Sequence, residues 1–278
     1  MHKNIRAVSF LIKIIFSDMD GTLLDSRSQL PVGFDEMMSE LKRRGVIFAP
    51  ASGRQYQSLL RSFGGYKDDF LFVAENGTLA MRHDEEIFSR AMRRAEADRV
   101  IEFGLSLKNI FIVFCGKKSS YYLESQFTPE GFAEFEKYFT KNIAVESFSD
   151  VDDEPLKISM FDVTKRAAEN IYPYLRAEFE GPLQVDLSSD QWVDVMSAGI
   201  NKGVAIRNVQ RILNVAPEEC AAFGDYLNDY EMMKAVGYGF AMANAHPDLK
   251  AVARCTTLSN DEAGVLVGIR KLIAEGLL

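Results

Sequence analysis

Cysteine is scarce in this chain of 278 residues, and long apolar runs are missing. The three cysteines lie far apart and form no CxxC pair: Cys115, Cys220 and Cys255. Because each stands among apolar residues, we expect buried, reduced thiols rather than catalytic ones, and a reducing compartment. The apolar stretch at 7–16 is interrupted by Lys13 and is much shorter than the ~20 residues that span a bilayer. We therefore expect no membrane partner and a cytoplasmic protein.

An excess of positive charge is also absent. The 32 Lys and Arg residues face 40 Asp and Glu residues, which gives a formal net charge of −8. Such a chain repels phosphate backbones, which argues against a dedicated nucleic-acid binder. A phosphorylated small molecule remains a compatible ligand, because one bound metal ion reverses the local field.

What the chain does have is an ordinary globular composition, with 47% hydrophobic and 26% charged residues. Plentiful apolar residues exclude disorder, and 19 glycines and 8 prolines without a period exclude a collagen-like chain. The length suits one large domain or two modest ones.

Short apolar runs alternate with amphipathic segments near both ends of the chain. At the start we expect strands at 12–16, 46–49 and 70–74, helices at 35–43 and 55–63, and then a hairpin. The alternation returns with strands at 192–196, 220–223 and 238–241 and helices at 202–213, 229–235, 247–253 and 261–275. This order implies parallel strands with right-handed crossovers.

The middle of the chain follows another pattern, in which strands and helices mix with longer polar connections. We expect strands at 110–114, 121–123, 156–161 and 183–187 and helices at 129–139 and 165–179. The prediction is an α/β fold with a Rossmann-like parallel-sheet core, 1–82 and 189–278, and an inserted α+β unit, 83–188.

The run Asp18-Met19-Asp20-Gly21-Thr22 directly follows the first strand, at the edge where open parallel sheets bind ligands. Asp18 and Asp20 lie on one side of an extended backbone, and Gly21 lets the chain turn away. The pair can hold Mg²⁺, or it can divide the roles of nucleophile and proton carrier. The alternative is a capped, solvated turn.

Two further motifs stand at strand-to-helix junctions. Ser52, Gly53 and Arg54 combine a hydroxyl with backbone amides at a helix start, which predicts an anion site. Alternatively, Ser52 only caps the helix and Arg54 lies on the surface. Lys202, within Asn201-Lys202-Gly203, can offset the charge of a phosphoryl group, although lysine is also commonplace at helix starts.

The fourth motif, Gly224-Asp225-Tyr226-Leu227-Asn228-Asp229, follows the strand at 220–223. Its acidic and amide side chains predict a hard-cation site, or alternatively a turn rich in Asx residues. Because all four motifs follow expected strands of the core, we expect them at the same edge of the sheet.

With these motifs in this order, the chain resembles the haloacid dehalogenase superfamily, and within it the Cof-type phosphatases with a large inserted cap. Glu75-Asn76-Gly77 and the run 241–245 belong to the same resemblance, which covers the whole chain. It implies that 1–82 and 189–278 form the hydrolase core and that 83–188 is the cap domain, which sets substrate specificity.

The resemblance also implies catalytic roles. Asp18 is the nucleophile that becomes an aspartyl-phosphate. Asp20 protonates the leaving oxygen and then activates water. Ser52 hydrogen-bonds a phosphoryl oxygen, and Lys202 orients and neutralises the phosphoryl group. Ser52 stands where threonine is usual, which keeps the hydroxyl.

Binding roles follow in the same way. The resemblance places Ser52, Gly53, Arg54, Asn76 and Lys202 at the substrate. It implies that Mg²⁺ binds to the metal ligands Asp18, Asp20 (through its carbonyl), Asp225, Asn228 and Asp229. Tyr226 stands in a position usually held by glycine, where a ring narrows the pocket.

The sequence therefore predicts a Mg²⁺-dependent phosphatase acting on a small phosphorylated metabolite such as a sugar phosphate. A phosphomutase or phosphotransferase, with a sugar hydroxyl as acceptor, is the alternative among enzymes. A third hypothesis is a catalytically inactive metabolite sensor, which would have no need to retain Asp18, Asp20, Lys202 and Asp225.

Overall fold

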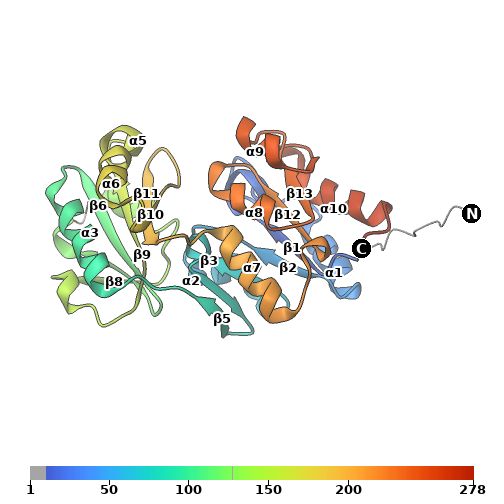
Figure 1. The fold of residues 1–278 in the computed structure, drawn as a ribbon, viewed down its shortest axis with the longest axis horizontal. Helices are drawn as coiled ribbons and strands as arrows, with labels where there is room; N and C mark the ends of the chain where they lie inside the picture. Colours follow the sequence, from blue (N-terminus) through green and yellow to red (C-terminus); the bar gives the residue numbers. More distant parts are fainter. Residues whose placement is uncertain (1–10, 127) are drawn as a thin grey trace, which may run out of the picture. The chain divides into compact units, whose positions relative to one another are not determined.

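The computed structural model describes residues 11–126 and 128–278. They form two compact units (Figure 1). One unit combines the described residues up to Ala49 with Gln210–Leu278, and the other is Pro50–Val209. Part of the apolar stretch noted above, 7–10, lies outside the described residues. The expected boundaries of core and cap, 1–82 with 189–278 and 83–188, stay a prediction.

A parallel five-stranded sheet, in the order β14–β13–β12–β1–β2, forms the centre of the first unit. Its strands are β1 (Ile14–Ser17), β2 (Ile47–Pro50), β12 (Cys220–Gly224), β13 (Tyr238–Ala241) and β14 (Cys255–Thr256). Ile14, Ile15 and Phe16 are fully buried, as suits a central parallel strand that is covered on both faces. The expected alternation of strands and helices is confirmed here.

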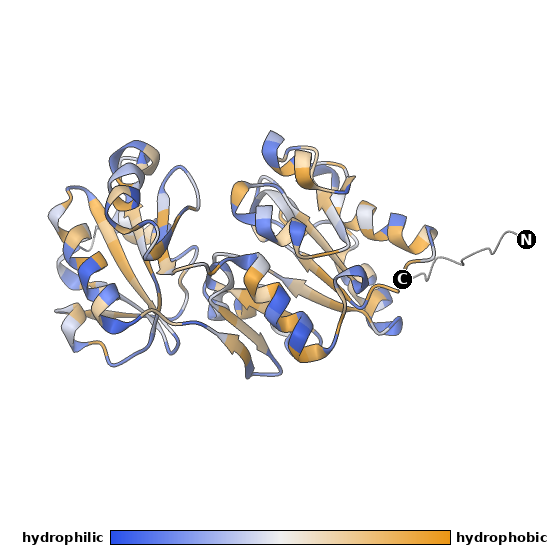
Figure 2. Ribbon diagram, viewed as in Figure 1, coloured by the Kyte–Doolittle hydropathy of each residue, from blue (hydrophilic) through white to orange (hydrophobic). Residues whose placement is uncertain are grey.

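Four helices pack in the first unit: α1 (Phe34–Arg43), α8 (Tyr230–Lys234), α9 (Pro247–Val252) and α10 (Gly264–Ala274). The longer α7 (Lys202–Leu213) runs from the second unit into the first. α1 buries Phe34, Met38 and Leu41 on one side, at helical spacing. Figure 2 shows the strands mainly in the hydrophobic colour and the helices in a mixture of both. No helix of the described residues has the length and apolar character needed to cross a bilayer.

The second unit begins with a small antiparallel sheet of β3 (Leu71–Ala74), β4 (Leu79–Arg82) and β5 (Glu85–Ser89). The hairpin expected from the sequence is thus confirmed. β3 was expected to be a third parallel strand of the core. Its parallel partner is a single bridge between Val73 and Ala51, because its backbone is otherwise paired with β4.

A mixed six-stranded sheet, in the order β10–β11–β9–β6–β7–β8, forms the rest of the second unit. Its strands are β6 (Ile110–Gly116), β7 (Ser120–Leu123), β8 (Asn142–Val145), β9 (Pro155–Asp162), β10 (Leu183–Leu187) and β11 (Trp192–Ser197). Placing the strand that starts at Trp192 with the core pattern was wrong. β11 pairs antiparallel with both β9 and β10, because polar Asp194 and apolar Val193 and Val195 alternate to match the two faces of this sheet.

Five helices complete the second unit: α2 (Tyr56–Phe63), α3 (Arg94–Ser106), α4 (Pro129–Phe135), α5 (Ala167–Asn170) and α6 (Tyr172–Phe179). The single helix expected at 165–179 was wrong, because the chain breaks at Ile171 between α5 and α6. Pro173 explains the break, since a proline lacks the N–H of a helix interior and its ring clashes with the preceding turn.

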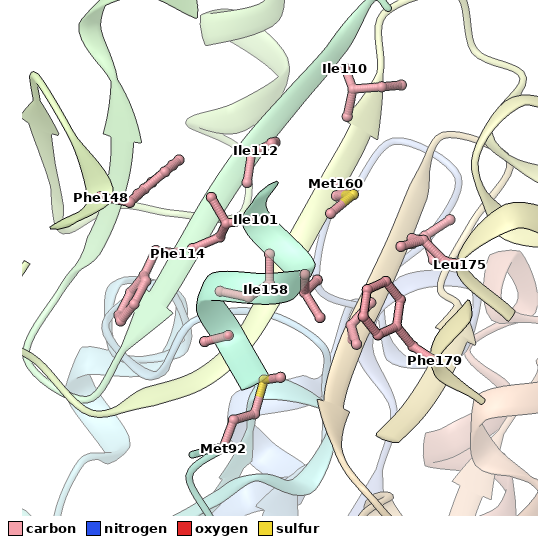
Figure 3. Close-up of a cluster of buried hydrophobic side chains, with 14 of the residues drawn as sticks. Met92, Ile101, Ile110, Ile112, Phe114, Phe148, Ile158, Met160, Leu175 and Phe179 are labelled. Atoms are coloured by element: carbon pink, nitrogen blue, oxygen red, sulfur yellow. The ribbon is translucent and has the colours of Figure 1, made fainter. Parts of the chain in front are cut away.

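The two faces of the mixed sheet differ in chemistry. One is apolar, where Ile112 of β6 and Ile158 and Met160 of β9 pack against Ile101 of α3 and Phe179 of α6 (Figure 3). The opposite face carries an aromatic cluster in which Phe111, Phe161 and Trp192 meet the end of α4 and the turn after it. Phe135, Phe139 and Trp192 are buried in this cluster, and Phe132 packs against it.

The three cysteines are free thiols. Cys115 and Cys220 are buried as expected, and burial raises the pKa of both, that of Cys220 to about 11. Cys255 is only half-buried, because it lies on β14, the edge strand of its sheet.

Candidate active site

An acidic cluster lies in the first unit, where the chain leaves β1 and β12. One carboxylate oxygen each of Asp18, Asp225 and Asp229 lies within 4.8 Å of the others. β1 and β12 are parallel neighbours with Ser17 opposite Phe223, so the residues after both strands leave the sheet at one edge. Asp18 is 8% exposed, and carboxylates this close repel one another unless a cation is present. Their hard oxygen atoms are ligands that Mg²⁺ prefers.

The turn after Asp18 brings the backbone close against the cluster. Gly21 has a φ of 74°, which favours glycine. A Cβ atom at Gly21 would lie 2.4 Å from Asp225 Oδ2, so any side chain there would displace this carboxylate. The amide of Leu23 donates to the Asp18 carbonyl at 3.3 Å and closes the turn.

Hydrogen bonds orient the carboxylates of the cluster. Thr22 Oγ1 donates to Asp225 Oδ1 at 2.7 Å. Asp229 Oδ2 accepts from the amides of Asp225 at 3.0 Å and Tyr226 at 3.3 Å. The side-chain amide of Asn244 donates a hydrogen bond of 2.8 Å to the carbonyl oxygen of Gly21. The motifs contain Thr22 and Asn244, but the pattern alone predicts no role for either, since the partner of each lies far away in the sequence.

The remaining residues expected at the metal lie beside this cluster. Asp20 is exposed, and its expected contribution as a ligand through its carbonyl stays a prediction. Asn228 is half-buried in the short turn after Tyr226. The Tyr226 ring lies edge-on to the His246 ring with centroids 6.0 Å apart. His246 precedes Pro247 and caps α9 by accepting a hydrogen bond from the Asp248 amide.

Ser52 lies in the second unit, directly after the bridge that joins Ala51 to β3. It is 3% exposed, and its amide donates to the Val73 carbonyl at 2.9 Å. Its carbonyl accepts from the Asn76 amide at 3.0 Å, and its Oγ accepts from the Arg54 amide at 3.2 Å. The alternative that Ser52 caps a helix is excluded, because Gln55 is the residue that precedes α2.

Asn76 is packed against this loop and is 1% exposed. Its Nδ2 atom donates to Asp194 Oδ2 at 2.6 Å and to Ser188 Oγ at 3.2 Å. A Cβ atom at Gly53 would lie 2.9 Å from Asn76 Oδ1, which explains why position 53 is a glycine. A contact between Asn76 and substrate stays a prediction.

Lys202 begins α7 and is fully buried. This burial argues against an ordinary surface lysine at a helix start, since lysine is almost never fully buried unless it is paired. Gly77 packs closely against Asn201, the residue before Lys202. A Cβ atom at Gly77 would lie 2.6 Å from the Asn201 carbonyl oxygen. Arg54 is half-buried, with its guanidinium carbon 5.6 Å from the ring centroid of Tyr138.

Sequence reasoning missed a buried charged cluster of Glu75, Lys157 and Asp194, which are 1%, 2% and 3% exposed. Lys157 Nζ lies 3.1 Å from Glu75 Oε2 and 3.4 Å from Asp194 Oδ1. Burial lowers the pKa of Lys157, but the two carboxylates more than reverse this and raise it. Burial raises the pKa of Glu75 against the opposing effect of Lys157. A signal was present, since Lys157 and Asp194 each interrupt an apolar strand.

The motifs thus form two groups. Asp18 and Asp20 of the first motif join Asp225 and Asp229 of the fourth in one unit. In the other unit, the loops of Ser52, Asn76 and Lys202 pack on one another through the contacts described above.

Comparisons with known proteins identify the family of this chain. Residues 15–269 match the family model of haloacid dehalogenase-like hydrolases. The chain is 28% identical over 267 residues to the 5-amino-6-(5-phospho-D-ribitylamino)uracil phosphatase YbjI of Escherichia coli, covering 94% of this chain and 96% of that protein.

Two solved structures have the same fold. SMU.1108c from Streptococcus mutans matches with a TM-score of 0.85 and 27% identity, over 95% of this chain and 99% of that one. The subclass IIB sugar phosphatase BT4131 matches with a TM-score of 0.78 and 22% identity, over 96% and 100% of the two chains.

The parallel sheet, the separate mixed sheet, the acidic cluster and the family match all lead to one assignment. The acidic cluster is consistent with metal binding. This chain belongs to the haloacid dehalogenase-like hydrolases, is a phosphatase of that family, and has the fold of its Cof-like, subclass IIB members.

Proposed function

We propose that this chain hydrolyses a sugar or polyol phosphate with Mg²⁺, by way of an aspartyl-phosphate on Asp18. The observation that carries the proposal is the acidic cluster, in which oxygen atoms of Asp18, Asp225 and Asp229 lie within 4.8 Å of one another at the end of β1 and β12. Phosphoryl transfer needs alignment and charge neutralisation above all, and a cation bound at such a site would supply both.

The proposed metal ligands are the carboxylates of Asp18 and Asp225 and the carbonyl of Asp20, with Asn228 and Asp229 supporting them. A bound Mg²⁺ ion would neutralise the carboxylates and the phosphoryl oxygens, so that one anion can approach another. The protein's own contribution is to hold the oxygen atoms in place through hydrogen bonds such as that from Thr22.

The proposed chemistry divides one difficult displacement into two easier ones. A carboxylate oxygen of Asp18 forms a bond to phosphorus while the bond from phosphorus to the ester oxygen breaks. Asp20 gives its proton to the departing oxygen. In the second step Asp20 takes a proton from water, whose oxygen forms a bond to phosphorus while the bond from phosphorus to the Asp18 oxygen breaks, and inorganic phosphate is released. The Asp18 carboxylate and the protonated Asp20 are then restored.

We assign phosphoryl binding to Ser52, Gly53, Arg54, Asn76 and Lys202. The Ser52 oxygen accepts from the Arg54 amide, which leaves its own O–H proton for donation to a phosphoryl oxygen. The buried ammonium of Lys202 supplies a positive charge at low dielectric, where charge is most effective.

The proposed sugar or polyol substrate has two supports. The name of the E. coli relative gives it a substrate with a phosphate ester on a ribityl chain, which is a polyol phosphate. On the mixed sheet, half-buried Gln184 donates to Asp186 Oδ1 at 2.6 Å, and this amide–carboxyl pair offers the hydrogen-bonding groups that substrate hydroxyls require.

The test is phosphate release from p-nitrophenyl phosphate and from a panel of sugar and polyol phosphates, with Mg²⁺ and with EDTA. The proposal predicts metal-dependent release, with the highest kcat/KM on a polyol or sugar ester. Transfer to an added sugar without release of phosphate would instead identify a phosphotransferase. If the folded protein releases no phosphate from any ester of the panel, hydrolysis is contradicted and a sensor is favoured.

A further inference from the structure

Lys157 is buried in the second unit, and its ammonium group contacts the Ser52 loop directly. Nζ donates to the Gly53 carbonyl oxygen at 2.7 Å, which is shorter than its 3.1 Å approach to Glu75 and its 3.4 Å approach to Asp194. The side chain is 2% exposed, so water does not compete for these contacts. The loop is thus bound to the middle of β9.

The peptide between Gly53 and Arg54 carries this contact to the Ser52 hydroxyl. A trans peptide is planar, and its C=O and N–H point in opposite directions. The C=O of this peptide faces Lys157, and the N–H of the same peptide donates to Ser52 Oγ at 3.2 Å. Fixing the carbonyl therefore fixes the donor that orients the Ser52 oxygen.

The turn at Glu75 and Asn76 holds the same loop from its other side. Their amides donate to the carbonyls of Arg54 at 3.1 Å and Ser52 at 3.0 Å. Both residues have a positive φ, of 51° and 55°, which costs free energy in a non-glycine residue. Their side chains reach the buried cluster, since Glu75 pairs with Lys157 and the Asn76 amide group donates to Asp194.

Stability alone does not account for such a cluster. Two carboxylates and an ammonium lose their hydration on burial, and apolar side chains of the same volume often stabilise a fold as well or better. What an ammonium can do, and a leucine cannot, is to hold one carbonyl group in one direction. The hydroxyls of Ser159 and Ser188 also donate hydrogen bonds to Asp194 and keep its carboxylate in place.

We propose that Lys157 is a positioning residue, which holds the Gly53 carbonyl so that the Ser52 hydroxyl is oriented toward the phosphoryl group. This proposal rests on the phosphoryl-binding role proposed for Ser52. Asp194 and Glu75 act through Lys157 by fixing its ammonium.

The test uses the double variant Lys157→Met with Glu75→Gln, which removes the ammonium without leaving Glu75 as a buried, unpaired charge. We expect a folded protein in which kcat/KM on p-nitrophenyl phosphate falls about 100-fold. We also expect the Kd for inorganic phosphate, measured by calorimetry with Mg²⁺ present, to rise about tenfold. An unchanged Kd and kcat/KM in the folded variant would overturn the proposal.

The matched control is Asp162→Asn. Asp162 lies at the end of β9, is also buried, and accepts hydrogen bonds from Thr164 and Asn170, which do not belong to the charged cluster. We expect this variant to unfold at a lower temperature while the phosphate Kd and kcat/KM stay at the wild-type values. If it weakens phosphate binding as much as the double variant does, the cluster has only a structural role.

A mutant cycle that combines these changes with Ser52→Ala tests whether Lys157 acts through the Ser52 hydroxyl. When Ser52→Ala is added to the double variant, we expect a further loss of no more than about twofold, because both changes remove the same interaction. Losses that multiply would overturn the proposed route. If the double variant does not fold, Lys157→Arg takes its place, since it keeps the charge but presents a longer, planar donor. An unchanged phosphate Kd in that variant would likewise overturn the proposal.

Failure of the proposed function would look different. Wild-type protein that binds phosphate but releases none from any ester would contradict hydrolysis, and the Kd comparison would still decide the role of Lys157. Wild-type turnover with a fully active double variant would leave hydrolysis in place and overturn only the positioning role.

Discussion

The Thr22 hydroxyl donates a hydrogen bond of 2.7 Å to Asp225 Oδ1 and so joins two motifs that lie 203 positions apart in the sequence. Thr22 is 1% exposed, which shields this bond from water. Hydrogen bonds of this kind aim a carboxylate at a metal and leave its other oxygen available for coordination.

Thr22→Val removes this hydroxyl at nearly constant volume. We expect the affinity for Mg²⁺ to fall about 10- to 100-fold, because Asp225 then loses a hydrogen bond that orients its carboxylate. The measurement is a Mg²⁺ titration of phosphatase activity, with direct calorimetry beside it. Thr22→Ser, which keeps the donor, should retain an affinity close to that of the wild type. Equal Mg²⁺ affinity in the wild type and the valine variant would show that Asp225 needs no such support.

Gly21→Ala tests the close approach of the backbone to the cluster. The new Cβ atom would lie 2.4 Å from Asp225 Oδ2 at a φ of 74°, so the carboxylate must move. We expect a loss of stability of about 1–2 kcal/mol from the backbone strain and the clash, and a large loss of Mg²⁺ affinity.

Gly45→Ala is the matched control for this change. Its φ of 70° gives a similar backbone penalty, but a Cβ atom there meets nothing within 4 Å. We expect a loss of about 1 kcal/mol in stability with no change in Mg²⁺ affinity. Loss of Mg²⁺ affinity in this control as well would mean that backbone strain, and not the contact with Asp225, explains the effect at Gly21.

The raised pKa of Asp186 leads us to expect an unusual dependence of folding stability on pH. Burial raises its pKa to about 6, with a further contribution from Asp194 on the neighbouring strand, against the lowering effect of the bond from Gln184. The unfolded chain therefore loses this proton at lower pH than the folded chain does. Stability falls as the pH rises from about 4 to about 6, and the loss is complete above that range.

Asp186→Asn abolishes this titration. We expect the variant to be more stable than the wild type by about 1–2 kcal/mol at pH 7, with the difference vanishing near pH 4. Chemical denaturation at both pH values measures it.

Asp162→Asn provides a contrast of opposite sign. Burial acts to raise the pKa of Asp162, but hydrogen bonds from Thr164 and Asn170 outweigh it and lower the pKa. We therefore expect this variant to be less stable than the wild type at pH 7, with a smaller difference as the pH falls toward the folded pKa of Asp162. A change in stability of the same sign at pH 7 in Asp186→Asn and Asp162→Asn would contradict the opposite pKa shifts of the two carboxyl groups.

Much of the fold follows from local patterns. The helix Phe34–Arg43 has apolar residues at helical spacing on one side. The apolar run Ile14–Ser17 is too short for a helix, and a polar turn between two short segments predicts the hairpin after Thr78. The strand at Trp192 shows the limit of such reasoning. Its apolar run fits either sheet, and only pairing with β9 and β10 decides its place.

The candidate site divides in the same way. Asp18 and Asp225 can be found because each directly follows a buried strand, and parallel strands end at one edge. Thr22, Lys157 and Asp194 could not be assigned, because each acts through a partner far away in the sequence. No short motif records such pairs.

The central claim is that Asp18 becomes phosphorylated, and the direct measurement is mass spectrometry of acid-quenched protein during turnover of p-nitrophenyl phosphate with Mg²⁺. We predict that the peptide containing Asp18 gains the mass of one phosphoryl group, that EDTA abolishes the gain, and that Asp18→Asn shows neither the gain nor more than about one per cent of wild-type turnover. Phosphate release with the phosphoryl group on another residue, or with an active Asp18→Asn variant, would contradict the account.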